Sequence, residues 1–215
     1  MNCSFIVPVN NRKQLKSLTA SLNVLGQEFE LIPIEGATSF FDAWRQGMAK
    51  AKGKYLCLTH QDTEYIAIPK LDKYLKDGVG MIGCAGTTVL HRDQPWWFST
   101  ERLQGSILSG QIFHKEKKGN KLSIFGDFGE VVVLDGVCLI TTKKILEDVG
   151  IPEKDYGTWD FYDHIISLEY IKKGYKLLTV PIVMTHLSKG GDKRPSFFES
   201  MDKFRKEYLD KTWRI

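Results

Sequence analysis

The feature that most constrains the fold is the regular alternation of short apolar segments with segments of helical periodicity in the first part of the chain. Strands are expected at residues 4–9, 29–34, 55–59 and 79–84. Helices are expected between them, at residues 13–25, 39–51 and near 70–76. Successive β-α-β units predict an α/β fold with a mainly parallel central sheet flanked by helices.

The second part of the chain has a different pattern. Residues 87–129 are rich in Gly, Ser and aromatic residues, and a hairpin is expected there, with strands at 106–114 and 122–125 and its turn at 115–121. Beyond it, helices are expected at 142–149, 160–173 and 197–209, and a strand at 176–184. Because no low-complexity linker interrupts the sequence, residues 1–215 are interpreted as a single domain with a smaller, β-rich region.

Composition excludes several classes of protein. A net charge of +4 suits an anionic ligand but does not provide the concentrated basic face of a nucleic-acid-binding protein. The longest apolar runs, at 131–134 and 177–183, are far shorter than a membrane span. The four cysteines lie singly in apolar segments, which predicts buried free thiols and a cytoplasmic location.

Polar residues follow the expected strands, where open α/β sheets bind their ligands. The first strand ends in Pro8, Val9, Asn10 and Asn11, without the glycine-rich phosphate loop of dehydrogenases or ATPases. A nucleotide is therefore expected to be held by side chains at several strand ends, with its base near these residues and a carboxylate from Glu35. The alternative is that Asn10 and Asn11 only form a helix-capping turn.

The strand at 55–59 ends abruptly in His60, Gln61 and Asp62. A carboxylate at this position can hold a divalent ion that neutralises a diphosphate leaving group. Asp62 is therefore the principal metal candidate, and His60 is interpreted as a ribose or phosphate contact. The alternative for this triplet is a loop-capping or solvated role.

The sequence blocks SFIVPVNN, SFFDAWRQGMAKAKGKYLCLTHQD, VVVLDG, WDFYDHIISLEYIKKGY and THLS occur in this order over most of the chain. Together they resemble the family 2 glycosyltransferases of the GT-A fold, in a branch where HQD replaces the DxD motif. The resemblance implies metal-dependent transfer of a sugar, with inversion, from a nucleotide diphosphate donor to a hydroxyl of a glycan or other acceptor. UDP is the favoured carrier, and Mn2+ or Mg2+ the expected ion.

The resemblance also implies roles for individual residues. Asp163 matches the general base, and Asp160 is an alternative because Tyr162 stands where the family has a glutamate. Asp62 and His186 would hold the metal ion. The alternative roles are dipole-stabilising caps for the two aspartates and a structural role for the histidine.

Further contacts follow from the residues themselves. Asp135 and Gly136 follow an apolar run, where a turn can approach a sugar or acceptor, although Asp135 can equally cap the turn. Trp96 and Trp159 are expected to stack on sugar rings, with a role in the core as the alternative. Lys189 and Arg194 are expected to contact phosphate, with a place in a solvated connecting loop as the alternative.

This interpretation divides the domain into a nucleotide-binding half at about residues 1–86 and an acceptor-side half at about 87–215. Two rival functions remain open. One is a nucleotidyltransferase, which would release pyrophosphate instead of nucleoside diphosphate. The other is a catalytically silent carbohydrate- or nucleotide-binding protein on the same scaffold.

Overall fold

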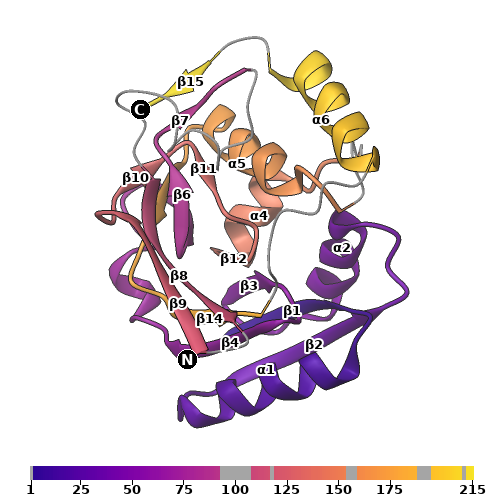
Figure 1. Cartoon of the computed structure of the whole chain (residues 1–215), viewed down its shortest axis with the longest axis vertical. Coiled ribbons are helices and arrows are strands. Elements are labelled where there is room, and N and C mark those ends of the chain that lie inside the picture. The colour runs from indigo at the N-terminus through magenta and orange to yellow at the C-terminus, as the bar shows by residue number, and fades with distance from the viewer. Residues whose placement is uncertain (1, 93–107, 117–118, 154–158, 188–194, 210–211) are drawn as a thin grey trace.

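The computed structural model of the chain describes residues 2–92, 108–116, 119–153, 159–187, 195–209 and 212–215 (Figure 1). Its largest element is a seven-stranded sheet in the order β10-β13-β5-β12-β3-β1-β2. The bounds of its strands are β1 Cys3–Val9, β2 Phe29–Glu35, β3 Tyr55–Thr59, β5 Val79–Gly83, β10 Glu130–Val131, β12 Cys138–Thr142 and β13 Lys176–Thr179.

A second sheet forms the smaller, β-rich region, in the order β11-β6-β8-β14-β4, with β9 paired to β8. Its strands are β4 Thr63–Ala67, β6 Ala85–Thr87, β8 Leu108–Glu116, β9 Gly119–Gly126, β11 Val133–Leu134 and β14 Val183–His186. A two-stranded pair of β7 Val89–Leu90 and β15 Trp213–Arg214 lies near the C-terminus. β3 leads directly into β4, and β13 into β14, so the two sheets meet at the carboxyl ends of these main-sheet strands.

Five helices among the described residues cover the sheets: α1 Arg12–Val24, α2 Phe40–Lys50, α4 Lys143–Val149, α5 Tyr162–Lys172 and α6 Pro195–Tyr208. α2 packs on β1 and β2, α4 on β12, and α5 on β11 and β13 (Figure 1). Ser39 caps α2 by accepting from the Asp42 amide, and Asp42 lies in the first turn, where the helix dipole favours negative charge.

The core explains why these elements pack in this way. The strands β1, β3, β5 and β12 are buried along almost their whole length, as expected for a sheet covered on both faces. The indole of Trp44 on α2 is fully buried. Gly47, one turn further along, lets α2 approach Ile6 so closely that a Cβ there would clash with it.

The α/β class with a central sheet flanked by helices is confirmed, while several local expectations were wrong. β12 was not expected, and it runs antiparallel between β3 and β5, which makes the main sheet mixed. The strand expected at 176–184 is two strands in different sheets, interrupted before β14 at Pro181, which lacks an amide donor. The helix expected near 70–76 is only a short 3-10 turn, Leu71–Lys73.

Other expectations hold in outline. The hairpin expected in the middle of the chain exists as β8 and β9; β8 has the expected length but begins two residues later, and β9 is longer than expected. The helix expected from residue 160 begins at Tyr162, because Phe161 has a left-handed conformation with φ of 59°. All four cysteines are buried and free, as expected. No helix in the described part of the chain has the length and apolar character needed to span a bilayer.

Candidate active site

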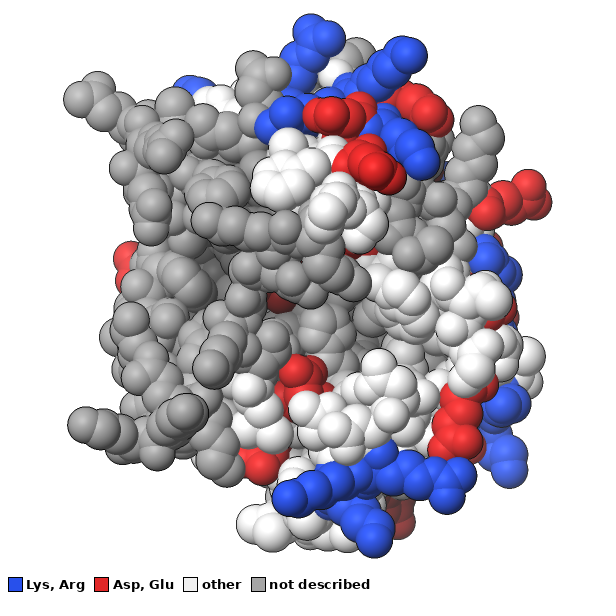
Figure 2. Space-filling view, turned by 45° about the vertical axis from the view of Figure 1, so that its right-hand side comes forward, with Lys and Arg blue, Asp and Glu red and all other residues white. Residues whose placement is uncertain are grey.

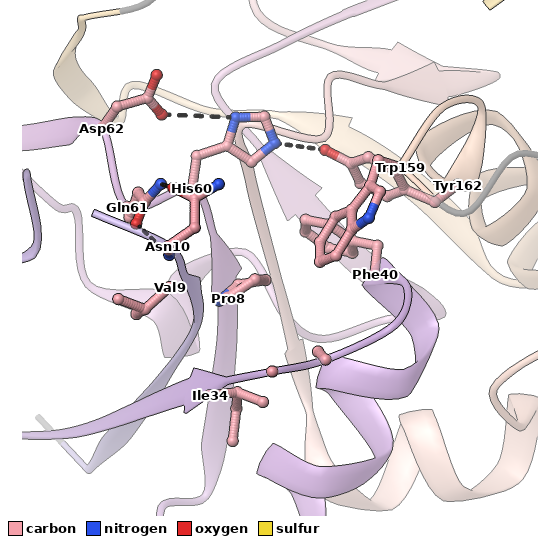
Figure 3. Close-up of a pocket in the computed structure, with 12 residues that line it drawn as sticks. Pro8, Val9, Asn10, Ile34, Phe40, His60, Gln61, Asp62, Trp159 and Tyr162 are labelled. Atoms are coloured by element: carbon pink, nitrogen blue, oxygen red, sulfur yellow. Dashed lines mark hydrogen bonds and ion pairs between the residues drawn. The ribbon is translucent and has the colours of Figure 1, made fainter. Parts of the chain in front are cut away.

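A pocket of about 670 Å³ opens where the carboxyl ends of β1, β2 and β3 meet (Figure 3). Its lining comprises Pro8, Val9, Asn10, Ile34, Gly36, Ala37, Phe40, His60, Gln61, Asp62, Trp159 and Tyr162. Figure 2 shows a hollow on one face of the molecule with acidic side chains inside it and Lys and Arg side chains gathered above and below. The residues that line the pocket give it an apolar part and a polar edge, and His60, Gln61 and Asp62 form this edge.

Three candidate metal ligands converge at this polar edge. His60 and Asp62 lie between β3 and β4, and His186 ends β14. The antiparallel pairing of β14 with β4 places His186 opposite Thr63, next to Asp62. Oδ1 of Asp62 lies 3.5 Å from Nε2 of His186 and 3.8 Å from Nδ1 of His60. One ligand atom from each residue lies within 4.8 Å of the others, a spacing that a single ion can bridge.

The electrostatics of this cluster favour the forms that bind a metal. Burial and the neighbouring His186 lower the pKa of His60 to about 4, so its imidazole is neutral at neutral pH. Burial raises the pKa of the Asp62 carboxyl, but the contacts with His186 and His60 outweigh this effect and hold the pKa below its usual value. Two imidazoles and one carboxylate are a donor set that suits Mn2+ and other divalent transition metals.

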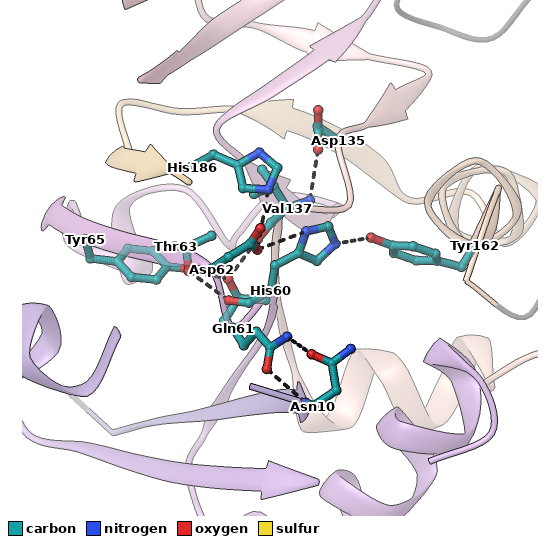
Figure 4. Close-up of polar contacts among 11 residues, drawn as sticks. Asn10, His60, Gln61, Asp62, Thr63, Tyr65, Asp135, Val137, Tyr162 and His186 are labelled. Carbon is teal, nitrogen blue, oxygen red and sulfur yellow. Dashed lines mark hydrogen bonds and ion pairs between the residues drawn. The ribbon is translucent and has the colours of Figure 1, made fainter. Parts of the chain in front are cut away.

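The sequence predicts that His60 contacts ribose or phosphate, and His60 does line the pocket. The structure adds a second possibility, because Nδ1 of His60 faces Asp62 beside His186 (Figure 4). The signal in the sequence was the spacing of His60 and Asp62, two residues apart at a strand end. Residues 60–62 form the turn between β3 and β4, and this turn brings both side chains into the cluster.

Tyr162 and Phe40 support the cluster, and neither was identified as a site residue from the sequence. The Tyr162 hydroxyl lies 2.5 Å from Nε2 of His60. The Tyr162 ring stacks on Phe40, with centroids 3.6 Å apart and an interplanar angle of 10°. Gly136 makes room for Tyr162, because a Cβ at this position would clash with its ring and hydroxyl.

Asp163 lies at the first turn of α5 and is buried. Its Oδ1 accepts from the backbone amide and Nδ1 of His164, at 2.9 and 2.7 Å, and its Oδ2 accepts from the Gly136 amide at 3.3 Å. Burial raises the pKa of Asp163, but His164 and the backbone donors outweigh burial and hold the pKa below its usual value.

Asp135 is half-buried in the turn between β11 and β12. Its Oδ1 accepts from the Val137 amide at 2.9 Å, so the turn-capping role considered for it exists. Burial, reinforced by the negative charge of Asp163, raises the pKa of Asp135 to about 6. The structure therefore brings Asp135, Gly136 and Asp163 together beside the cluster.

Of the residues predicted from the sequence to bind the nucleotide, the structure places some in the pocket and others outside it. Pro8, Val9, Asn10 and Gln61 line the pocket. Oε1 of Gln61 accepts from the amides of Asn10 and Asn11, both at 2.9 Å, and its amide nitrogen donates to the Asn10 side chain.

Asn11 and Glu35 do not line the pocket. Asn11 is the N-cap of α1 and accepts from the amides of Lys13 and Gln14. Glu35 is exposed and forms an ion pair with Arg12 at 3.1 Å. The capping alternative is therefore what the structure shows for Asn11, and Glu35 would have to leave Arg12 to contact a base.

Two further candidates, Trp159 and Asp160, precede α5. Trp159 lines the pocket, is 40% exposed and contacts Phe40 edge to face. Asp160 is half-buried and precedes α5, so it does not share a helical face with Asp163 as expected. Trp96, Lys189 and Arg194 lie outside the described residues.

The fold is shared with solved glycosyltransferases. A structure of GalNAc-T7 with UDP, GalNAc and Mn2+ has a TM-score of 0.56 at 12% identity and covers 94% of this chain, which spans only 47% of that protein. The mannosyltransferase PcManGT from Pyrobaculum calidifontis, in complex with GDP-Man and Mn2+, has a TM-score of 0.54 at 13% identity, covering 96% of this chain and 70% of its own.

A third solved structure, A197 from STIV, has a TM-score of 0.50 at 12% identity and covers 90% of this chain and 100% of its own. A sequence search of curated proteins found no significant match. By contrast, the model of a family described as a glycosyltransferase-like family matches residues 4–211, nearly the whole chain. The protein therefore belongs to this glycosyltransferase-like family.

Proposed function

We propose that this protein transfers a sugar, with inversion, from a nucleoside diphosphate donor to a hydroxyl of a glycan or other acceptor, and that Mn2+ or Mg2+ is required. The observation that carries the proposal is the convergence of His60, Asp62 and His186 at the edge of a strand-end pocket of about 670 Å³. Family membership and the shared fold support the same reaction class.

The pocket has space and chemistry for a nucleotide. Its apolar part, which includes Pro8, Val9 and Ile34, suits a base and ribose, and its polar edge at Asp62 suits a diphosphate bridged to a cation. UDP is our favoured donor carrier. Because the solved relatives hold UDP in one case and GDP-Man in the other, both nucleotides belong in the test.

A divalent ion bound at this cluster would neutralise charge that develops on the departing diphosphate. Asp62 and His186 are the proposed ligands, and the position of His60 makes it the third. In this proposal the triplet His60-Gln61-Asp62 takes the part of a DxD motif. Gln61 does not join the cluster but holds the loop after β1 through the backbone of Asn10 and Asn11.

Inversion requires a base that takes the acceptor proton while the acceptor oxygen attacks the anomeric carbon opposite the diphosphate. Asp163 is the base that we propose, with Asp160 as the alternative, and Asp135, which lies near Asp163, is proposed to contact the sugar or acceptor. Trp159, exposed at the pocket, offers an aromatic face for a sugar ring. Asp160, Trp96, Lys189 and Arg194 keep the roles that the sequence predicts for them, as proposals.

Product analysis tests the proposal. The protein is incubated with Mn2+ and a panel of UDP-sugars, GDP-mannose and nucleoside triphosphates, and released nucleoside diphosphate and pyrophosphate are quantified separately. We expect metal-dependent release of nucleoside diphosphate from at least one nucleotide sugar, with little release by Asp62→Ala. Pyrophosphate release would show a nucleotidyltransferase instead, and nucleotide binding without any release would show a silent binding protein.

A further inference from the structure

We propose that His164 is a positioning residue for the base of this transfer, because it holds Oδ1 of Asp163 and leaves Oδ2 as the oxygen that takes the acceptor proton. The inference rests on the proposed function, in which Asp163 is the base, and deepens it by naming the side chain that orients this base. It follows from the hydrogen bonds of the carboxylate, from the burial of the imidazole and from the place of both residues beside the pocket.

Two donors of His164 converge on one oxygen of Asp163. Nδ1 of the imidazole lies 2.7 Å from Oδ1 of Asp163, and the backbone amide of His164 donates to the same oxygen at 2.9 Å. Asp163 is ionised at neutral pH, because its pKa lies below the usual value, and an ionised carboxylate can only accept. Nδ1 therefore carries the proton and donates. One bond from the ring and one from the backbone together fix the orientation of the carboxylate.

The other oxygen of Asp163 is held more loosely. Oδ2 accepts from the Gly136 amide at 3.3 Å, which is longer than the usual range for such a bond. A carboxylate oxygen held by one weak donor has room for a second, such as a substrate hydroxyl. The Asp163 side chain is 12% exposed, whereas the His164 side chain is fully buried. Oδ2 is thus the oxygen with the capacity to take a proton from a bound acceptor.

Asp163 lies beside the pocket and is connected to the metal-ligand cluster. Tyr162, which precedes it at the start of α5, lines the pocket, and its hydroxyl lies 2.5 Å from Nε2 of His60. Gly136 joins the two residues of α5, because its amide donates to Oδ2 of Asp163 and a Cβ there would clash with the Tyr162 ring. Oδ2 therefore contacts the same backbone against which the Tyr162 ring packs.

His164 is itself held by aromatic packing. The centroid of its ring lies 5.1 Å from that of Phe161 and 5.4 Å from that of Phe204 on α6, the second in an edge-to-face arrangement. Both phenylalanine rings are buried. Water is thereby excluded from the imidazole and does not compete with Nδ1 for the carboxylate, so the hydrogen bond is stronger than it would be at the surface.

The charged and titratable neighbours of Asp163 come from several elements. Burial raises the pKa of Asp163, but the contacts with His164 on α5, the main opposing effect, hold it below its usual value. Asp135 in the turn before β12, His60 after β3 and Tyr162 on α5 also interact with its charge. Loss of the His164 imidazole should therefore raise the pKa of Asp163. The acid limb of kcat/KM, which follows ionisation of the base, should then move to higher pH.

The proposed step is balanced. The acceptor hydroxyl proton passes to Oδ2 of Asp163 as the acceptor oxygen forms its bond to the anomeric carbon. The bond from that carbon to the diphosphate oxygen breaks, and its electron pair leaves with the nucleoside diphosphate. His164 keeps its Nδ1 proton throughout, and Asp163 then releases the acceptor proton to water. In the absence of a known acceptor, water takes the place of the acceptor hydroxyl.

The test uses three variants of His164 and Mn2+-dependent release of nucleoside diphosphate from UDP-glucose, UDP-N-acetylgalactosamine and GDP-mannose. His164→Asn keeps an N–H donor near the position of Nδ1, His164→Gln displaces the donor, and His164→Leu removes it. We expect kcat per UDP-binding site to fall about 10²-fold in His164→Gln and His164→Leu, and less than about tenfold in His164→Asn. Calorimetric affinities for UDP and Mn2+ should not change, and the acid limb of His164→Leu should move to higher pH.

Two further variants separate positioning from a merely structural role. Ile166→Val perturbs a fully buried position of the same helix and should keep the wild-type kcat. Adding His164→Gln to Asp163→Asn should cause no further loss of kcat, because His164 acts through Asp163. A further loss as large as that in the wild-type background would show that His164 acts independently of the base.

Equal kcat values of His164→Asn and His164→Gln, or full activity of His164→Leu, would overturn the inference. If His164→Leu does not fold, as judged by circular dichroism, the comparison of His164→Asn with His164→Gln decides alone. No release by the wild type from any nucleotide sugar would contradict the proposed function itself. Failure of the inference and failure of the proposed function are thus distinguishable.

Discussion

Nε2 of His60 lies 2.5 Å from the hydroxyl oxygen of Tyr162, and this contact joins the end of β3 to the start of α5. A protonated Nε2 that donates to Tyr162 leaves the lone pair of Nδ1 directed toward Asp62 (Figure 3). Such outer partners of a metal-binding histidine fix its tautomer and its orientation. Tyr162 can therefore support metal binding without contacting the ion.

Tyr162→Phe removes this contact while keeping the stack on Phe40. We expect Mn2+ affinity to fall about 10–100-fold, the usual effect of losing an outer partner of a metal ligand. Calorimetric titration with Mn2+ measures it. Tyr175→Phe is the matched control, because it removes an exposed hydroxyl that only donates to Asp148. Equal affinities of Tyr162→Phe and the wild type would contradict a role for this contact.

Gly136→Ala tests the packing that gives Tyr162 its place. The added methyl group would displace the Tyr162 ring, so we expect a loss of about 1–3 kcal/mol in the free energy of unfolding, together with weaker Mn2+ binding. Urea denaturation and metal titration measure the two effects. At Gly129 an added Cβ meets no atom within 4 Å, so Gly129→Ala should change neither quantity. A fully stable Gly136→Ala protein would show that Tyr162 is not held as described.

Asn11→Ala separates capping from nucleotide binding. Because Asn11 accepts from two amides at the start of α1, the substitution should cost about 1 kcal/mol of stability. UDP affinity should remain unchanged, since Asn11 does not line the pocket. Asn23→Ala, an exposed position in the same helix, should not reduce stability. A clear loss of UDP affinity in Asn11→Ala would restore the nucleotide-binding role.

Asp135→Asn should stabilise the metal-free protein at neutral pH. The folded pKa of Asp135, about 6, lies above its ordinary value of 3.8, so ionisation of Asp135 costs stability as pH rises through this range. We expect the variant to be more stable by about 1–3 kcal/mol at pH 7 and by much less near pH 4. Urea denaturation across this range measures the difference, and a constant or reversed difference would contradict the raised pKa.

Much of the fold follows from local sequence patterns. The strands β1, β2, β3 and β5 and the helices α1 and α2 have clear periodicity and end signals such as Gly26 and Ser39. β12 is harder to recognise in the sequence, because only the turn at Asp135 and Gly136 separates it from the apolar residues that precede it. Its antiparallel direction depends on which strands it meets, which is set by tertiary packing and not by its own residues.

The sequence predicts those site residues whose role depends on their position directly after a strand. Asp62 was identified in this way, and His186 through the family resemblance, and the structure brings both into one cluster. The pairing of β14 with β4 places His186 beside Asp62 and His60, and this pairing cannot be seen in the sequence. The support from Tyr162 and the engagement of Asp163 by His164 depend on side-chain contacts that only the folded chain reveals.

The most direct test of the account is calorimetric titration with UDP, with and without Mn2+, on the wild type, Asp62→Ala and Asp148→Ala, and then with GDP. Asp148 is an exposed carboxylate on α4 and serves as the matched control. The account expects UDP binding that requires Mn2+, is lost in Asp62→Ala and is kept in Asp148→Ala. Absence of UDP and GDP binding by the wild type, or unchanged binding by Asp62→Ala, would contradict a metal-dependent nucleotide-sugar site at this cluster.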